Sequence, residues 1–224
     1  MKLLKKFNDP AVLIKESCDI LGIQLPDTRT RMIVQHLLML VQWRDRVNLT
    51  SVKNPLDIAL LHFVDSLTVF KVISMGSGLS VLDIGSGGGF PGMVLKVADP
   101  SMRIALMDKD PKKIVFLKYV ARELGLTDIV FFQTIVAELA ESPRSHTFDV
   151  VVSRAFSSDP SVLDSLSAFL QPGGALVRMA GPSDTSPIEL PSFQIEQVWE
   201  GCLPFSTNFR RVYRYVAHCA PRGV

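Results

Sequence analysis

A glycine-rich loop near the middle of the chain restricts the possible folds more than any other feature. The short segment Val81-Leu82-Asp83-Ile84 leads directly into Gly85-Ser86-Gly87-Gly88-Gly89-Phe90-Pro91-Gly92. Five glycines within eight residues are entropically costly, but glycine lets a backbone turn sharply and come close to a ligand. In open α/β sheets, ligands bind at the carboxyl ends of the strands. The segment therefore predicts a strand followed by a ligand-binding loop.

Downstream of the loop, apolar segments of strand length alternate with amphipathic helical segments. The predicted strands cover residues 81–84, 103–107, 129–132, 148–153 and 175–179, the predicted helices cover 111–124 and 162–170, and residues 193–198 and 212–217 form a closing pair of strands. This alternation is typical of a mostly parallel sheet with helices on both faces. We therefore expect a doubly wound, Rossmann-like α/β fold.

Residues 1–75 have a helical pattern throughout. Helices are expected from Pro10 to about Gly22 with Asn8 and Asp9 as candidate caps, from a Thr28 cap to Val41, and from Pro55 to Phe70. Residues 74–80 form a polar linker. The chain thus divides into a helical N-terminal extension (1–75) and a ligand-binding α/β domain (76–224).

The composition is that of a globular protein. The chain has 224 residues, 47% of them hydrophobic, which suits one large domain with an appendage. No apolar run approaches the ~20 residues of a membrane span, and the basic start lacks the apolar stretch of a secretory signal. The cysteines, Cys18, Cys202 and Cys219, show no CxxC spacing, so we expect reduced thiols, a cytoplasmic location and no metal site.

The charge distribution permits an anionic partner without requiring one. The formal net charge is +2 at pH 7. Basic residues gather in two places, with Arg210, Arg211, Arg214 and Arg222 near the C-terminus and Lys109, Lys112, Lys113 and Lys118 around one predicted helix. Such clusters occur on phosphate-binding surfaces and equally on ordinary solvated faces.

Two cofactor classes fit the loop. Residues 87–92 match the GxGxxG string of dinucleotide enzymes, but there the first strand should lead directly into the first glycine, which here is Gly85. Read from Gly85, the loop is GxGxG preceded by Asp83, and it resembles motif I of class I methyltransferases. Asp108, at the end of the second predicted strand, could accept hydrogen bonds from two ribose hydroxyls. The predicted cofactor is S-adenosylmethionine, bound in part by Gly85, Gly87 and Asp108.

The sequence lacks the marks of two common methyl acceptors. Methylation of exocyclic amines commonly goes with an Asn/Asp-Pro-Pro-aromatic tetrapeptide after the fourth strand, where this chain has Val152-Ser153-Arg154-Ala155-Phe156. Methylation at C5 of a pyrimidine needs a cysteine nucleophile, and no cysteine lies at the predicted ligand edge. Guanine N7 has a free lone pair and needs neither device. The pattern favours a ring nitrogen, and equally some small molecules; no catalytic residue is assigned.

Further motifs give the chain a resemblance to a known family. They are Asn48-Leu49-Thr50, His62 with Asp65-Ser66, residues 85–92 with Phe90-Pro91-Gly92, Asp108 before Lys112-Lys113 and Phe116-Leu117, Ala137-Glu138, and Ser153-Arg154-Ala155-Phe156. Together they resemble the RsmG (GidB) family of bacterial methyltransferases, from about Trp43 to Leu170. The resemblance implies an enzyme that methylates N7 of one guanine in 16S ribosomal RNA, with that RNA or the small ribosomal subunit as partner.

The resemblance also implies cofactor contacts from Gly85, Phe90, Ala137, Glu138 and Arg154. Each has a structural alternative: Phe90 as core, Glu138 as a solvated acid at a helix start, and Arg154 as an ion-pair partner. His62 and Asp65, three apart on one helix, are expected to bond each other and to pack the extension against the sheet.

The chain departs from the family pattern at two points. Family members usually carry Lys-Gly after the fifth strand, where this chain has Ala180-Gly181. They also carry a basic residue where this chain has Ile135, or Val136 if the register slips by one. Arg178 shares a strand face with Ala180 and could supply the missing cation, although a solvent-facing arginine is the simpler interpretation. Three functions follow: a monomeric ribosomal RNA methyltransferase, a small-molecule methyltransferase, or a non-catalytic ribosome-binding module.

Overall fold

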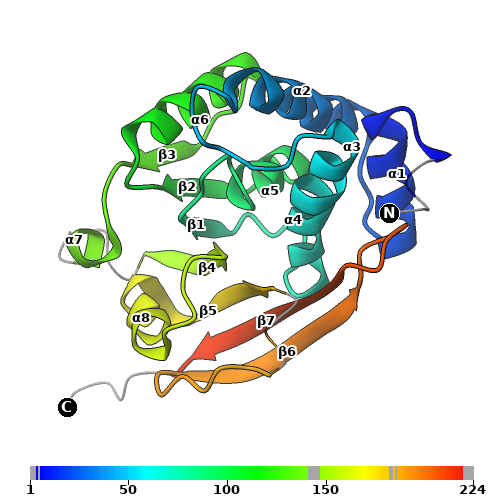
Figure 1. Ribbon diagram of the computed structural model, residues 1–224. Coiled ribbons are helices and arrows are strands. Elements are labelled where there is room, and N and C mark those ends of the chain that lie inside the picture. The colour runs from blue at the N-terminus through cyan, green and yellow to red at the C-terminus, as the bar shows by residue number, and fades with distance from the viewer. Residues whose placement is uncertain (1–3, 5, 141–146, 182–183, 185, 219–224) are drawn as a thin grey trace, which may run out of the picture.

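The chain forms one seven-stranded sheet with helices on both faces (Figure 1). The structure is a computed structural model and describes residues 4, 6–140, 147–181, 184 and 186–218. The strand order is β3-β2-β1-β4-β5-β7-β6, and only β7 and β6 run antiparallel to their neighbours. The strands are β1 (Ser80–Ile84), β2 (Arg103–Met107), β3 (Ile129–Phe132), β4 (Phe148–Arg154), β5 (Leu170–Ala180), β6 (Phe193–Cys202) and β7 (Phe209–Ala217). The predicted fold class is confirmed.

The first 71 residues supply the helical extension. Its elements are α1 (Pro10–Leu21), α2 (Asp27–Trp43) and a continuous helical stretch made of α3 (Pro55–Ile58), the π-helix η2 (Ala59–Val64), α4 (Asp65–Leu67) and the 3-10 helix η3 (Thr68–Lys71). Asp9 and Asn54 cap α1 and α3 through their side-chain oxygens. The Thr28 cap is wrong: α2 begins at Asp27, after Pro26, and has no side-chain cap. The Asp27 carboxylate instead pairs with Lys15 of α1.

The remaining helices connect the strands. They are α5 (Gly92–Ala98), α6 (Pro111–Glu123), α7 (Val136–Ala140), α8 (Pro160–Asp164) and the 3-10 helix η4 (Ser165–Phe169). The sequence did not predict α5, because every residue of this short helix is buried and a uniformly apolar segment shows no helical period. The single helix expected over 162–170 is α8 continued by η4, and β5, β6 and β7 are longer than predicted.

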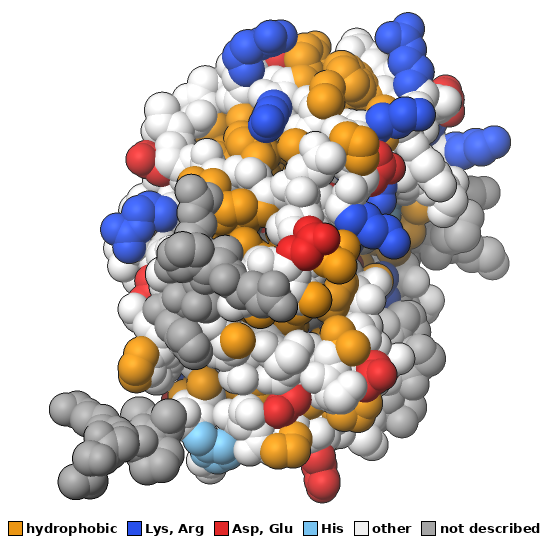
Figure 2. Space-filling view, turned by 90° about the vertical axis from the view of Figure 1, so that its left-hand side faces the viewer, with side chains coloured by type: hydrophobic (Ala, Val, Ile, Leu, Met, Phe, Trp, Pro, Cys, Tyr) orange, Lys and Arg blue, Asp and Glu red, His pale blue; other side chains and the backbone are white. Residues whose placement is uncertain are grey.

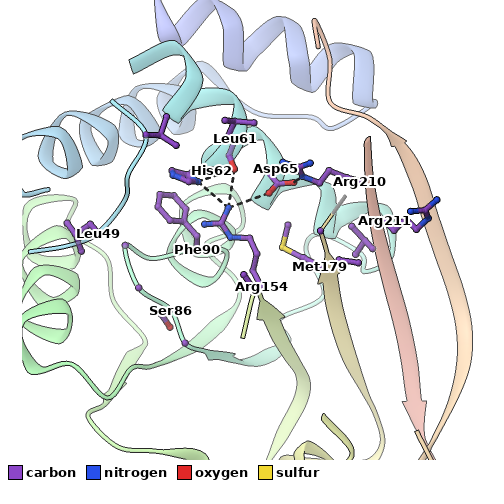
Figure 3. A pocket seen from close by; sticks show the side chains of 18 residues that line it. Leu49, Leu61, His62, Asp65, Ser86, Phe90, Arg154, Met179, Arg210 and Arg211 are labelled. Carbon is purple, nitrogen blue, oxygen red and sulfur yellow. Dashed lines mark hydrogen bonds and ion pairs between the residues drawn. The ribbon is translucent and has the colours of Figure 1, made fainter. Parts of the chain in front are cut away.

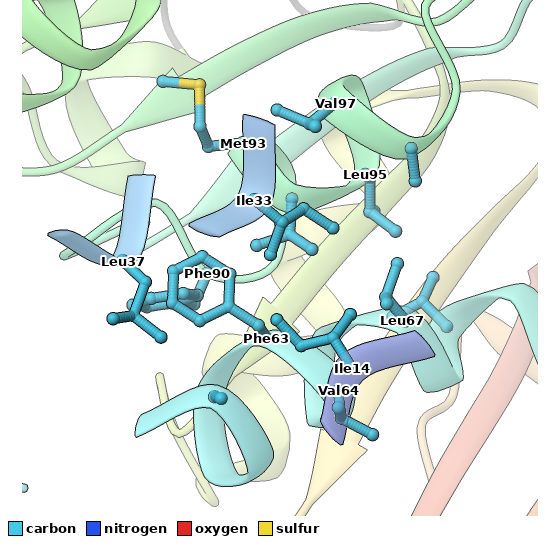
Figure 4. Close-up of a cluster of buried hydrophobic side chains, with 14 of the residues drawn as sticks. Ile14, Ile33, Leu37, Phe63, Val64, Leu67, Phe90, Met93, Leu95 and Val97 are labelled. Carbon is cyan, nitrogen blue, oxygen red and sulfur yellow. The ribbon is translucent and has the colours of Figure 1, made fainter. Parts of the chain in front are cut away.

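Each face of the sheet has its own core. On one face, side chains of β1, β2 and β4 pack with α5, α6 and the N-terminal helices; on the other they pack with α8 and η4. The extension therefore shares a core with the sheet (Figure 4), where Ile33 and Leu37 of α2 and Phe63 of η2 lie near Phe90 and Met93. This packing holds the helical extension directly above the glycine loop.

Candidate functional site

The glycine loop begins at the carboxyl end of β1, where the fold places a ligand. The Gly85 and Ser86 amides both donate to the Met107 carbonyl of β2, each at 2.9 Å, which turns the loop out of the sheet. Gly85, Gly87 and Gly89 have φ values of +74°, +54° and +94°. The left-handed region that these angles occupy strongly favours glycine.

The glycines of this loop serve two purposes. A β-carbon on Gly88, Gly89 or Gly92 would come within 2.8 Å of a side-chain atom of the protein, so internal packing requires these three glycines. For a β-carbon on Gly87 the nearest protein atom is the backbone carbonyl oxygen of Gly85 at 3.8 Å, and for one on Gly85 it is a ring carbon of Phe156 at 3.4 Å. Gly85 and Gly87 also line a cavity of about 420 Å³. The positive φ values favour glycine at these two positions, and packing leaves the space over their backbone open, so a ligand could lie directly against it.

Asp83 holds the far end of the loop. Its buried Oδ2 accepts a hydrogen bond from the Gly92 amide at 2.9 Å, while Oδ1 has no hydrogen-bond partner among the described residues. Burial raises the pKa of this carboxyl to about 7. The acid therefore fixes the start of α5 and does not line the cavity.

His36 of α2 fixes the middle of the loop. Its Nε2 donates to the Gly88 carbonyl at 2.9 Å, and its ring stacks on Phe90 with centroids 5.6 Å apart. The side chain is fully buried, and burial lowers its pKa to about 4, so the imidazole is neutral at physiological pH. No sequence pattern predicted this contact, because a lone histidine among apolar helix residues is typical of core.

A buried ionic cluster forms one wall of the cavity (Figure 3). Arg154, at the end of β4, donates from Nη1 to the Leu61 carbonyl at 3.2 Å and to Asp65 Oδ2 at 3.4 Å. The other Asp65 oxygen accepts from Arg210 Nε at 3.0 Å. The Arg154 guanidinium also lies 4.9 Å from the centre of the Phe90 ring. One carboxylate between two guanidiniums leaves a formal charge of +1.

The expected bond between His62 and Asp65 is wrong. His62 Nε2 lies 2.7 Å from Thr50 Oγ1 and its Nδ1 lies 3.0 Å from the Leu61 carbonyl, while Asp65 turns to the two arginines. The π-helical segment η2 ends at Val64, between the two residues. Burial, and secondarily Arg154, lower the pKa of His62 to about 4. Asp65 nevertheless joins the extension to β4 and β7, as its expected packing role requires.

The remaining predicted cofactor residues lie outside this cavity. Asp108 accepts from the Gly87 amide at 3.0 Å and from the Asp110 amide at 2.9 Å, so it is bonded to the same loop. Ala137 and Glu138 belong to α7, and Thr134, which precedes that helix, donates to Glu138. The structure thus brings Gly85, Gly87, Phe90 and Arg154 to one cavity and Asp108 to its edge, with the pair on α7 farther out.

The C-terminal arginines are largely neutralised by acids. Arg210 pairs with Asp65, Arg211 with Glu200 and Arg214 with Glu196, whereas Arg222 and Cys219 lie outside the described residues. Lys109 and Lys112, next to α6, are exposed. On the face in Figure 2, the visible Lys and Arg side chains gather in the upper half, the side on which Figure 1 places α6.

Arg178 is buried rather than facing solvent, so the simpler interpretation of this residue is wrong. Only 4% of it is exposed, and its Nη2 pairs with Asp184 at 2.9 Å. Since β7 and β6 continue the sheet past β5, β5 is an internal strand with a neighbouring strand along each edge. Ala180 is buried in the same face of the sheet as Leu176, in agreement with the predicted alternation.

Comparison with known proteins decides the family. The model of the GidB family, described as rRNA small subunit methyltransferase G, matches residues 29–204. The chain belongs to the GidB family. It is 37% identical over 200 residues to the ribosomal RNA small subunit methyltransferase G of Geobacter metallireducens, covering 85% of this chain and 88% of that protein. The protein of the same name from Herminiimonas arsenicoxydans is 34% identical, with 84% and 88% covered.

Solved structures agree on the fold of this GidB protein. A SAM dependent methyltransferase from Aquifex aeolicus superposes with a TM-score of 0.54 at 17% identity, covering 72% of this chain and 93% of that one. TrmN from Thermus thermophilus gives a TM-score of 0.52 at 18% identity, with 69% and 48% covered. The GidB chain therefore has the fold of S-adenosylmethionine-dependent methyltransferases.

Two features are absent from the described part of this GidB chain. No helix there has the length and apolar character to cross a membrane. Among the residues that the structure describes, no group of three or more histidine, cysteine or acidic side chains could hold a metal ion.

Proposed function

We propose that this GidB protein transfers the methyl group of S-adenosylmethionine to N7 of a guanine in small-subunit (16S) ribosomal RNA. The observation that carries the proposal is the division of the glycine loop. Internal packing leaves no room for a β-carbon at Gly88, Gly89 or Gly92, whereas at Gly85 and Gly87, which line the cavity, no protein atom comes closer than 3.4 Å to such a carbon. An intact backbone cradle at the carboxyl end of β1 supports a cofactor-binding enzyme over a non-catalytic ribosome-binding module.

The residues around the cradle suit the chemical groups of S-adenosylmethionine. The cluster of Asp65, Arg154 and Arg210 carries a formal charge of +1 at the cavity wall, and it would attract the cofactor's carboxylate. Each Asp108 oxygen accepts one backbone hydrogen bond and keeps a second lone pair for a ribose hydroxyl. Glu138 on α7 is the candidate for the adenine edge, with Ala137 beside it.

The acceptor is inferred from the groups that surround the cavity. When bound, S-adenosylmethionine supplies an electrophilic methyl carbon on a sulfonium, and a good nucleophile then mainly needs positioning. Neither Cys18 nor Cys202 lines the cavity, and both nitrogens of His62 lie within 3.0 Å of neighbouring oxygens. None of these three side chains therefore presents a free base or a thiolate to the methyl acceptor. Guanine N7 carries no proton and requires neither.

Base-resolved mapping of N7-methylguanine tests the function. Small-subunit ribosomal RNA from cells with and without this protein would be compared, and the purified protein would then be added back to RNA and to assembled subunits. We expect one N7-methylguanine that depends on the protein. Identical methylation in both cell types would overturn the proposal. We further propose that the protein acts as a monomer in the cytoplasm; sedimentation and cell fractionation test these two points.

A further inference from the structure

A second cavity adjoins the first at the same edge of the sheet. It has a volume of about 600 Å³ and lies between the loop after β4 and the end of β5. Ala155, Met179 and Gly181 line both cavities, so the two spaces share a wall. Its polar side chains are Ser153, Ser157, Ser158, Asp159, Arg178 and Asp184. A group in this cavity would lie next to one held by the glycine loop.

Arg178 leaves one donor unused in this cavity. Its Nη2 pairs with Asp184, but its Nη1 is buried and has no hydrogen-bond partner among the described residues. Tyr213 faces Arg178 directly across the β5–β7 ladder, and its buried hydroxyl also lacks a described partner. A buried donor without a partner is unfavourable, so an acceptor that binds there would recover the lost hydrogen-bond free energy.

The charges of the cavity argue against a phosphate as the arriving group. Arg178 is neutralised by Asp184, and Asp159 brings the formal charge of the lining to −1. A neutral group with an acceptor next to donors fits better, because Arg178 offers a donor and the Asp184 carboxylate beside it offers acceptors. The Watson–Crick edge of guanine has this arrangement, with O6 as acceptor followed by the N1 and N2 donors.

We propose that this second cavity receives the target guanine, with Arg178 Nη1 donating to O6 and Asp184 Oδ1 accepting from N1 and N2, because Asp184 Oδ2 already accepts from Arg178 and the Gly181 amide. The assignment rests on the proposed function. Reading the Watson–Crick edge leaves N7, on the other side of the ring, free to face the methyl donor. The base must then leave its stack to enter the cavity, as in other enzymes that modify bases.

The same carboxylates suit the chemistry at N7. As the new N–C bond forms, the methyl group leaves the sulfonium sulfur with no bonding electrons, and the positive charge moves onto the purine ring. Asp159 and Asp184 stand in the cavity before the reaction, and their negative charge favours the developing cation. Arg178 donates to O6 and not to N7, whose lone pair stays free for the methyl group.

Nucleoside binding tests the cavity without RNA. Guanosine, inosine, 2-aminopurine riboside and adenosine would be titrated by ligand-observed NMR into protein saturated with S-adenosylhomocysteine, which blocks the adenosine site. We expect guanosine and inosine, which share O6 and N1–H, to bind about 10- to 150-fold more tightly than the other two. Arg178→Ala should abolish this preference. Arg178→Lys keeps the charge opposite Asp184 but lacks the second guanidinium nitrogen, so this variant should also lose the preference for guanosine and inosine. Equal binding of all four nucleosides, or a preference that survives in both variants, would overturn the assignment.

Turnover on the small subunit separates this inference from the proposed function. We expect kcat/KM to fall at least tenfold in both Arg178 variants while the Kd for S-adenosylmethionine and the unfolding midpoint of Arg178→Lys stay unchanged. Arg103→Ala, an exposed strand arginine at the opposite end of the sheet, is the matched control. Wild-type turnover in both Arg178 variants would refute the guanine contact and leave the proposed function standing. Absence of N7-methylguanine with the wild-type protein would refute the proposed function itself.

Discussion

The buried imidazole of His36 donates to the Gly88 carbonyl at 2.9 Å and so joins two positions 52 residues apart in the chain. Through this bond the helical extension fixes the backbone conformation of the loop that faces the cavity. Asp83 and Asp108 hold the same loop at Gly92 and Gly87. The loop is thus fixed at three places before any ligand arrives, which reduces the ordering cost of binding.

Replacing His36 by leucine should loosen the loop. The variant leaves the Gly88 carbonyl without a partner in a buried place, which costs about 1–3 kcal/mol of unfolding free energy and weakens S-adenosylmethionine binding. His36→Gln, which retains a donor, should recover part of both losses. Urea denaturation and calorimetry measure the two effects. A leucine variant that matches the wild-type protein in both would show that the bond does not hold the loop.

His36 should also make stability depend on pH. Its pKa is about 4 in the folded protein and 6.5 ordinarily, so the unfolded chain binds more protons between these values. The contribution of His36 is therefore present above pH 6.5 and is lost as the pH falls toward 4, by up to about 3 kcal/mol. Asp83, with a pKa raised to about 7, acts in the opposite direction. The wild-type protein and His36→Gln share the contribution of Asp83, so the difference between their unfolding free energies at each pH isolates the histidine. A difference that stays constant from pH 7 to 4 would contradict this assignment.

Gly87→Val should abolish S-adenosylmethionine binding and leave the protein folded. A β-carbon at Gly87 meets no protein atom closer than 3.8 Å, so the branched side chain would enter the space that the ligand needs. Gly125→Val is a matched control, because Gly125 has a similar φ of +60° and open space around it, outside the cavity. Calorimetry should show lost binding only at position 87. Unchanged affinity in Gly87→Val would refute the assigned cofactor cradle.

Asp108→Ala should weaken S-adenosylmethionine binding by ~1.5–3 kcal/mol, the range for hydrogen bonds to a charged group. The variant removes the acceptor for the ribose and also frees the Gly87 amide. Asp108→Asn keeps one acceptor oxygen and should lose less. Titration with NADH should give no heat in any of the three proteins; a dinucleotide signal would favour the dehydrogenase class instead.

RNA binding should depend on salt through the lysines at α6 more than through the arginines of β7. Arg210, Arg211 and Arg214 are each paired with an acid, whereas Lys109 and Lys112 are exposed. Each phosphate contact contributes roughly 0.7–0.9 log units of affinity per tenfold change in salt. The double variant Lys109→Ala/Lys112→Ala should reduce the salt dependence of the affinity by the contribution of about two phosphate contacts. Lys15→Ala on α1 should leave that salt dependence unchanged. A flat slope in the wild-type protein would favour a small-molecule substrate.

The sequence by itself determined the sheet and the position of the loop. Buried parallel strands are continuous apolar runs that can be recognised in the sequence. Residues 85–92 follow the first of these runs, and local backbone conformation alone requires glycine at Gly85, Gly87 and Gly89. These signals depend on residues close together in the chain, so they can be read without knowing the fold. The family motifs are of the same local kind.

Only the tertiary structure decided which side chains meet at the site. His36 on Gly88, Asp65 between Arg154 and Arg210, and Arg178 against Asp184 all depend on helices or loops packing over the sheet. The division between ligand-facing and packing glycines is likewise invisible in the sequence, since all five are the same residue there. Long-range packing and burial decide such contacts, and they also explain why Arg178 is buried although its sequence context suggested a surface residue.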